Sequence, residues 1–513
     1  MKSQLKAGAV LSYLALFISS AISIIYTPVM LKLLGQSEYG LFSLATAAVS
    51  YVGVLNFGLG NAVINYTAKY KVLKDKTSIS NLYGLFCIMY GILGIIALIL
   101  GMILTLNSHL IFSNSLNINE INQLKIIMGV TVINISLGIG FGFFSVISLA
   151  HEKFIFQKVL GIVSSIFSPL VMLPLLLMGY GSISMAIVTT ILNFITILIN
   201  IIYCFNVLKI NITFKKIEIS LLKEILGFSF FIFINLIIDK IYWSTDQIIL
   251  GIYSGTVAVS IYTVGATFSG YFSGLSASIS NVFLSKVSGM VAKEVSDKEI
   301  SDLFIKIGRL QYIVISFALS GFIVFGQEFI FLWVGEDYID SFIIAILILV
   351  PMIVPLIQGM GGLILQAKNM QKFKTVVYAV VAIANVLLSI IFVQWWGAIG
   401  TALATALAFT IGNIIIMNFY YWKKIRLDIP MFWKNIIMMS TPFAVSLIFG
   451  ATINNIVPAE NWILFLLKVF LFIIAYFGIL WFAGMNKYEK NIFVLPFKNI
   501  IMSYKKGILH KVR

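Results

Sequence analysis

The stretch Gly227–Gly251, GFSFFIFINLIIDKIYWSTDQIILG, is long enough to cross a bilayer, yet three charged residues lie in its middle. On a helix, with about 100° per residue, one face gathers polar and aromatic side chains: Asn235, Asp239, Tyr242, Trp243 and Asp246, with Lys240 at its flank. A charge near the bilayer centre costs about 2.5–3.5 kcal/mol, so this face is expected to meet a polar cavity or buried partners. Two interpretations stay open: a structural ion-pair cluster between helices, and a path for a substrate or an ion.

The composition of the whole chain is that of a polytopic membrane protein. Hydrophobic residues make up 60% of the 513 residues, charged residues make up 11%, and the mean hydropathy is +1.04. The two cysteines, Cys87 and Cys204, lie inside apolar segments, and no spacing of cysteine or histidine indicates a metal or redox site. We therefore expect neither a cofactor nor a metal centre.

Windowed hydropathy predicts fourteen membrane-spanning helices. Their expected bounds are 8–34, 40–66, 82–106, 124–149, 158–178, 182–206, 226–250, 256–285, 307–332, 341–365, 375–394, 398–421, 435–457 and 461–484. All but four of the 35 lysines and arginines lie in the N-terminus, the even-numbered loops and the C-terminal tail. By the positive-inside rule these segments, and with them both termini, are cytoplasmic. The net charge of +16 is then explained by the basic residues of the cytoplasmic loops, and no nucleic-acid partner is expected.

The four basic residues outside this pattern are Lys32, Lys125, Lys240 and Lys468. Lys32 and Lys125 lie near the outer ends of spans, where snorkelling to the surface is the alternative to a functional role. Lys240 is too deep to snorkel. It is therefore the strongest candidate for a functional cation.

Spans one to six and spans seven to twelve share landmarks at a nearly constant offset. LLGQSEYG around Gly35 corresponds to LGIYSG around Gly251, and GSISMA at Gly181 corresponds to GAIGTA at Gly397. An even number of spans per half relates the halves by an axis along the membrane normal, with a central cavity between them. The expected organisation is a six-helix bundle over 1–208, a cytoplasmic linker over 209–225, a second six-helix bundle over 226–422, two extra helices over 435–484 and a basic cytoplasmic tail over 485–513.

Four stretches carry a resemblance to a known family. They are TPVMLKLLGQSEYGLFSLATA (27–47), NFGLGNAVINYTAKY (56–70), STDQIILGIYSGTVAVSIYTVG (244–265) and FGQEFIFLWVGEDYIDS (325–341). In them the chain resembles the polysaccharide (Wzx-type) flippases of the multidrug/oligosaccharidyl-lipid/polysaccharide exporter superfamily. The resemblance implies an all-α polytopic membrane protein in which two six-helix bundles are related by pseudo-twofold symmetry and followed by two C-terminal helices.

The resemblance also implies a function. Such a protein translocates an oligosaccharide linked to undecaprenyl diphosphate across the bacterial cytoplasmic membrane by alternating access, for a surface polysaccharide such as O-antigen or capsule. Expected partners are this lipid-linked substrate, membrane lipids, H⁺ or Na⁺ as a coupling ion, and the polysaccharide polymerase and chain-length proteins. No covalent step, and hence no enzyme activity, is expected.

The candidate residues fit these tasks. Lys240 would lower the desolvation cost of the diphosphate, with Lys32 and Lys125 nearer the outward mouth. The aromatic candidates for stacking on sugar rings are Tyr26, Tyr242 and Trp243. The acidic candidates, Asp239 and Asp246, would hold the coupling ion or neutralise Lys240.

Three other functions compete with this one. Ion-coupled drug exporters of the same superfamily usually have twelve spans. Peptidoglycan-precursor flippases typically carry several arginines in their first half, whereas the arginines here are Arg309, Arg426 and Arg513. A membrane enzyme of glycan assembly needs a large loop or an acid–base cluster, and the acidic group Glu336, Asp337 and Asp340 has no histidine or basic partner near it in sequence.

Overall fold

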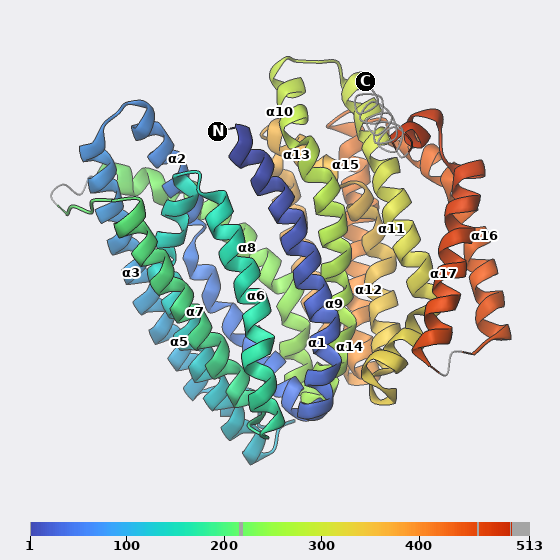
Figure 1. The fold of residues 1–513 in the computed structure, drawn as a ribbon, viewed down its shortest axis with the longest axis horizontal. Helices are drawn as coiled ribbons and strands as arrows, with labels where there is room; N and C mark the ends of the chain where they lie inside the picture. The colour runs from blue at the N-terminus through green and yellow to red at the C-terminus, as the bar shows by residue number, and fades with distance from the viewer. Residues whose placement is uncertain (1, 215–218, 459–460, 493, 495–513) are drawn as a thin grey trace, which may run out of the picture. The chain divides into compact units, whose positions relative to one another are not determined.

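A computed structural model of the chain describes residues 2–214, 219–458, 461–492 and 494. The regular elements of these residues are helices (Figure 1). The first half contains α1 (Lys2–Ser50), α2 (Leu59–Val72), α3 (Lys76–Leu106), α4 (Ser108–Phe112), α5 (Ile118–Ala150), α6 (Phe154–Leu177) and α7 (Gly181–Ile202). The second half contains α8 (Ile219–Tyr253), α9 (Gly255–Ser280), α10 (Leu284–Ala292), α11 (Asp297–Val334), α12 (Asp340–Ile357), α13 (Gly359–Ala367), α14 (Gln371–Phe409), α15 (Met417–Lys423), α16 (Ile429–Ile456) and α17 (Trp462–Ile479).

Ten helical segments among the described residues are long and apolar enough to cross a membrane. Two of them, Leu14–Val72 with 59 residues and Gln371–Lys423 with 53, are each long enough for two crossings, and each overlaps two predicted spans. The ten segments thus correspond to twelve of the fourteen predicted spans, and the other two predicted spans overlap α8 and α9. The prediction of an all-α polytopic membrane protein is confirmed.

Two glycines explain how the long segments turn. Gly35 interrupts α1 with φ +75°, and Gly397 interrupts α14 with φ +53°. A side chain with a Cβ rarely adopts this left-handed conformation, whereas glycine does so at little cost. Both positions fall between two predicted spans, so the chain reverses there within one nearly continuous helical segment.

Tertiary contacts divide the chain into two compact units. The first comprises residues 1–267, 343–345 and 375–408; the second comprises 268–342, 346–374 and 409–513. The boundaries expected for the two bundles, the linker and the tail stay a prediction. Residues 215–218 of the linker and 493 and 495–513 of the tail lie outside the described residues.

In the first unit, α3, α5 and α7 lie side by side, and α1 packs against α5, α6 and α8 (Figure 1). Aromatic residues of α3 and α5 form a large part of its core, among them Tyr83, Phe86, Tyr90 and Phe143. Three polar residues from distant segments meet as well. The Glu120 carboxylate accepts hydrogen bonds from Ser37 at 2.9 Å and from Thr256 at 3.0 Å. These contacts tie α1, α5 and α9 together.

In the second unit, α11 packs against α16 and α17. Tyr476 on α17 lies with its hydroxyl 2.7 Å from Ser316 on α11, among the aromatic rings of Phe317 and Phe472. These two buried hydroxyls are therefore paired with each other, as burial requires.

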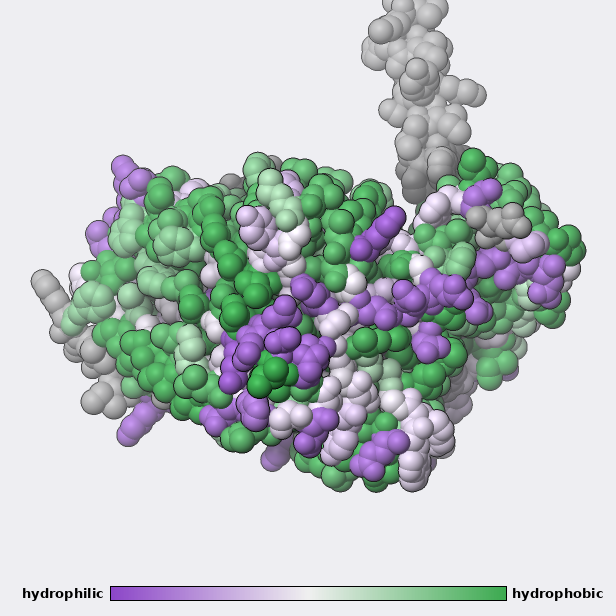
Figure 2. Space-filling model, turned by 90° about the horizontal axis from the view of Figure 1, so that it is seen from below, coloured by the Kyte–Doolittle hydropathy of each residue, from purple (hydrophilic) through white to green (hydrophobic). Residues whose placement is uncertain are grey.

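Apolar side chains cover much of the surface. Large exposed residues include Ile463 on α17 and Leu110 on α4. On the face shown in Figure 2, broad hydrophobic areas surround patches in which hydrophilic residues gather. Such a surface suits a protein whose solvent is lipid over most of its height.

Candidate functional site

Helix α8 carries most of the residues that the sequence singles out, and it divides them into two rows. Tyr242 and Asp246, one turn apart, are buried with exposed fractions of 7% and 2%. Asn235, Asp239 and Trp243 follow one another at intervals of four residues and are exposed. The single polar face expected from the sequence is therefore a buried row beside an exposed row.

Three hydroxyl groups donate hydrogen bonds to the Asp246 carboxylate. Tyr262 on α9 donates at 2.6 Å, and Ser389 and Thr405 on α14 donate at 2.9 Å and 2.7 Å. The side-chain amide of Asn385 donates to Thr405 Oγ1 at 3.4 Å. These residues are all buried. We call them the Asp246 cluster: Asp246, Tyr262, Asn385, Ser389 and Thr405.

The charge of Asp246 has no cationic partner within the part of the chain that the structure describes. Hydroxyl donors stabilise a carboxylate but do not neutralise it, and an uncompensated charge in an apolar interior is costly. A proton or a small cation would remove this cost. Carboxylate, hydroxyl and amide oxygens are also the ligands that hard cations prefer. The cluster is therefore suited to hold H⁺ or a cation such as Na⁺.

Lys240 lies on the same helix but outside the cluster. A rise of about 1.5 Å per residue places it about 9 Å from Asp246 along the axis. Its carbonyl oxygen accepts a hydrogen bond from Tyr51 at 3.2 Å, and Tyr51 also bonds Thr245. No ion pair among the described residues joins the Lys240 ammonium to a carboxylate. The half-buried cation thus keeps its capacity to bind an anion.

Two other candidates on α8 contact helix α14. Asn235 Oδ1 accepts a hydrogen bond from Thr375 at 3.1 Å. The Tyr242 ring lies 6.3 Å from the ring of Tyr378, centroid to centroid. Trp243 has an exposed fraction of 44%. Of the two aromatic candidates on α8, Trp243 is thus the more accessible.

The remaining candidates lie on α1 and α5. Tyr26 donates a hydrogen bond to the Met172 sulfur at 3.5 Å. Lys32 is exposed on α1, and Lys125 is half-buried on α5. No contact among the described residues joins these three to the Asp246 cluster. The structure therefore does not gather all the predicted residues at one point.

The sequence analysis missed the other four residues of the Asp246 cluster. For three of them, Asn385, Ser389 and Thr405, the signal is polar side chains at four-residue intervals inside apolar spans: Asn385 and Ser389 in one span, Thr401 and Thr405 in the next. The sequence analysis also assigned no role to Lys468. Lys468 is buried and forms an ion pair with Glu328, Nζ to Oε2 2.6 Å.

Known proteins share both sequence and fold with this chain. The model of the family described as polysaccharide biosynthesis protein matches residues 5–284. A protein of Haloferax volcanii described as probable flippase AglR is 24% identical over 437 residues, which are 81% of this chain and 83% of that protein.

Two solved structures show the same fold. The lipid II flippase MurJ in an inward closed conformation superposes with a TM-score of 0.73 at 19% identity, covering 96% of this chain and 100% of that chain. An inward-facing multidrug resistance MATE family transporter of the MOP superfamily superposes with a TM-score of 0.65 at 14% identity, covering 82% and 96%. The resemblance expected from the sequence is confirmed. Because the family model covers more than half of its length, the chain belongs to the polysaccharide biosynthesis protein family.

Proposed function

We propose that this protein is a flippase. It moves an oligosaccharide linked to undecaprenyl diphosphate from the cytoplasmic to the outer leaflet of the bacterial cytoplasmic membrane, for surface polysaccharide biosynthesis. Both termini are cytoplasmic, and the polysaccharide polymerase and chain-length proteins are its partners in the pathway. Family membership supports a substrate of polysaccharide biosynthesis, and the relative described as a probable flippase supports the transport role.

The observation that carries the transport proposal is the buried, uncompensated Asp246 carboxylate with its three hydroxyl donors. A polar site of this kind inside a membrane domain is expensive to keep without a function. We assign it the coupling ion, H⁺ or Na⁺. Its three helical segments, in α8, α9 and α14, respond together when the ion binds or leaves.

The exposed row of α8, together with the half-buried Lys240, serves the substrate in this proposal. Lys240 faces the diphosphate, where a cation offsets the cost of bringing an anion into a low-dielectric region. Trp243 presents a partly exposed ring to a sugar face. Asn235 and Asp239 supply hydrogen bonds beside them.

A drug exporter of the same superfamily is the second candidate. The fold shared with the MATE transporter favours it, since that structure covers 82% of this chain. A membrane enzyme of glycan assembly is a third alternative, which the flippase and transporter neighbours do not favour. The flippase and the exporter differ in substrate, so transport of a lipid-linked glycan decides between them.

Complementation tests the proposal. Wild type, Asp246→Asn and Lys240→Ala are expressed in a strain that lacks its own polysaccharide flippase, and labelled lipid-linked glycan is followed across the membrane. Asp302→Asn, which removes an exposed carboxylate on α11, is the matched control, and protein abundance is measured for each variant. We expect wild type and Asp302→Asn to restore export, while Asp246→Asn and Lys240→Ala fail at normal abundance.

Two results would contradict this function. If wild type restores no export but lowers drug accumulation, the protein is an exporter. If wild type restores export and both variants do so equally well, the charged residues of α8 are structural.

A further inference from the structure

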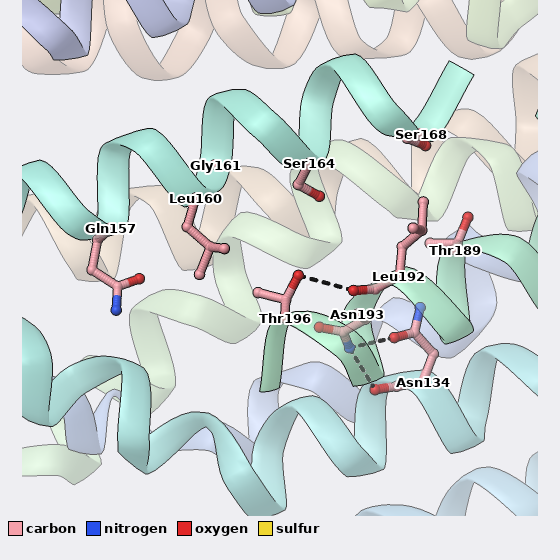
Figure 3. Close-up of a pocket in the computed structure, with 10 residues that line it drawn as sticks. All are labelled: Asn134, Gln157, Leu160, Gly161, Ser164, Ser168, Thr189, Leu192, Asn193 and Thr196. Atoms are coloured by element: carbon pink, nitrogen blue, oxygen red, sulfur yellow. Dashed lines mark hydrogen bonds between the residues drawn. The ribbon is translucent and has the colours of Figure 1, made fainter. Parts of the chain in front are cut away.

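A cavity of about 470 Å³, lined by polar and apolar side chains, lies among α5, α6 and α7, apart from the Asp246 cluster. Figure 3 shows its lining side chains, which come from all three helices. None of its ten lining residues is charged. Its polar lining includes Asn134, Gln157, Ser164, Thr189, Asn193 and Thr196.

The sequence builds this cavity from helical spacing. On α6, Gln157, Gly161, Ser164 and Ser168 recur every three or four residues and so share one face. On α7, the same holds for Thr189, Asn193 and Thr196. Two polar rows inside apolar helices face each other across the cavity, and the small Gly161 and serines leave the space open.

Part of the polar lining is already paired. Asn193 Nδ2 donates to the Asn134 side-chain and main-chain oxygens, and Thr196 donates to the Leu192 carbonyl, as Figure 3 shows. Gln157 Nε2 donates to Asn200 Oδ1 at 2.6 Å. These bonds hold the amides in fixed orientations.

Other polar atoms at the cavity have no hydrogen-bond partner among the described residues. They are the Ser164 hydroxyl, Asn134 Nδ2, Gln157 Oε1 and Asn193 Oδ1. The set combines donors with acceptors and carries no charge. Its ligand must therefore be neutral and must offer several groups that both donate and accept hydrogen bonds.

These properties narrow the ligand to one chemical class. The lining offers no carboxylate to bind a cation and no basic group to bind a phosphate. An apolar ligand would leave the unpaired amide atoms buried without a hydrogen-bond partner, which costs free energy. The volume falls in the range of about 300–1,000 Å³ that is typical of small-molecule sites. We propose that this cavity is a binding subsite for a neutral sugar residue, in addition to the site on α8.

The cavity lies next to a residue already assigned to sugar contact. Ser168 donates to the Met172 sulfur at 3.8 Å, and Tyr26 on α1 donates to the same sulfur at 3.5 Å. Met172 thus separates the cavity from Tyr26 by a single side chain. The subsite rests on the proposed function, and it would select the glycan part of the substrate while Lys240 meets the diphosphate.

Filling the cavity tests the subsite. A Cβ on Gly161 meets no atom within 4 Å, so the backbone there accepts a side chain, and Gly161→Leu is expected to fill part of the cavity. Gly91→Leu on α3 is the matched control, because its Cβ also meets no atom and the residue lies outside the cavity. A second pair compares two neighbouring, shape-conserving changes on α7: Thr189→Val inside the cavity and Thr190→Val outside it.

The measurement is saturation-transfer NMR on the full-length protein in lipid nanodiscs. The probes are free neutral hexoses, 6-deoxyhexoses and N-acetylhexosamines, with glucuronic acid and inorganic phosphate as charged comparisons. Ligands with so few atoms are expected to bind in the millimolar range. We expect at least one neutral sugar to bind wild type and Gly91→Leu, with affinity at least about tenfold lower for Gly161→Leu and lowered for Thr189→Val but not Thr190→Val.

The subsite is overturned if no neutral sugar binds, if Gly161→Leu binds as wild type does, or if only the charged probes bind. This readout is independent of export. If wild type restores glycan export but shows no cavity-dependent sugar binding, the subsite fails and the flippase function stands. If sugar binding depends on Gly161 but no glycan is exported, the flippase function fails and the subsite stands.

Discussion

Lys468 and Glu328 form an ion pair between α17 and α11, with Nζ 2.6 Å from Oε2, in which Lys468 is buried and Glu328 is partly exposed. The Lys468 side chain also donates to Asn454 Oδ1 on α16 at 2.7 Å. One ammonium thus joins the two last membrane helices to α11. All three of its hydrogen-bonding positions are used, so the group is satisfied although it is almost fully buried.

Removing one partner of this pair should destabilise the second unit. Lys468→Met removes the cation that faces the Glu328 carboxylate; the cost is about 3–5 kcal/mol for a fully buried pair and should be smaller here, because Glu328 is partly exposed. The double variant Lys468→Met/Glu328→Gln removes both charges and should regain most of this loss. Thermal unfolding in detergent, followed by tryptophan fluorescence, measures both variants. Equal losses in the single and double variants would show that packing, not charge, is what Lys468 supplies.

The hydroxyl donors of Asp246 should set the affinity for the coupling ion. Ser389→Ala and Thr405→Val each remove one hydrogen-bonding oxygen, and each is expected to weaken ion binding by about 10-fold or more, as loss of a supporting ligand does at metal sites. Thr401→Val is the control, because Thr401 is buried one turn before Thr405 and its hydroxyl donates to the Ala398 carbonyl, with no contact to Asp246 among the described residues.

Titration with Na⁺ and with H⁺ in proteoliposomes identifies the ion. Compared with wild type, glycan transport by Ser389→Ala and by Thr405→Val should require a higher concentration of the coupling ion. Its dependence on the concentration of the other ion should be unchanged. If both variants titrate as Thr401→Val does, the cluster has no part in coupling.

Gly40 should tolerate no larger residue. Its Cβ would lie 1.9 Å from the Thr256 carbonyl oxygen, so even Gly40→Ala forces α1 and α9 apart. We expect Gly40→Ala to lower the free energy of unfolding by about 1–3 kcal/mol. We also expect it to disrupt the hydrogen bonds from Ser37 and Thr256 to Glu120. Gly129→Ala on α5, where a Cβ meets nothing within 4 Å, is the control. Melting temperatures of the two variants in detergent make the comparison, and equal values would contradict the close approach.

His151 should make stability depend on pH. Burial, together with the nearby Lys71, lowers the pKa of His151 below its usual value, while Nδ1 bonds the Ile147 carbonyl at 3.0 Å. The unfolded chain therefore binds the proton more readily than the folded one. The stabilising contribution is complete above the unfolded pKa of about 6.5 and is lost as pH falls below it.

The measurement compares melting temperatures between about pH 7 and pH 5. Wild type should lose stability over this window, and His151→Gln should lose less. A variant with the same slope as wild type would assign the pH dependence to other groups.

The spans were predictable because each depends on local apolarity. Gly35 and Gly397 were recognisable only as landmarks of the repeat, since a positive φ leaves no mark in hydropathy. The same local apolarity predicted the spans 226–250 and 256–285, which correspond to α8 and α9.

The partners of the polar residues were not predictable in the same way. Asp246 meets Ser389 and Thr405, which lie 143 and 159 residues further along the chain, and Lys468 meets Glu328 across 140 residues. Helical periodicity assigns a side chain to a face but does not name the helix opposite. The sequence therefore indicated that α8 needs polar partners, and only the packing of the helices identified them.

The neutrality of the Asp246 donors has an electrical consequence. With a monovalent cation bound the cluster carries no net charge, and without it the cluster carries one negative elementary charge. A membrane voltage of 100 mV changes the electrostatic energy of such a charge by up to about 2.3 kcal/mol. In the proposed cycle, the membrane voltage would therefore change the energy of the Asp246 cluster when no ion is bound. It would not change the energy of the cluster when the cation is bound.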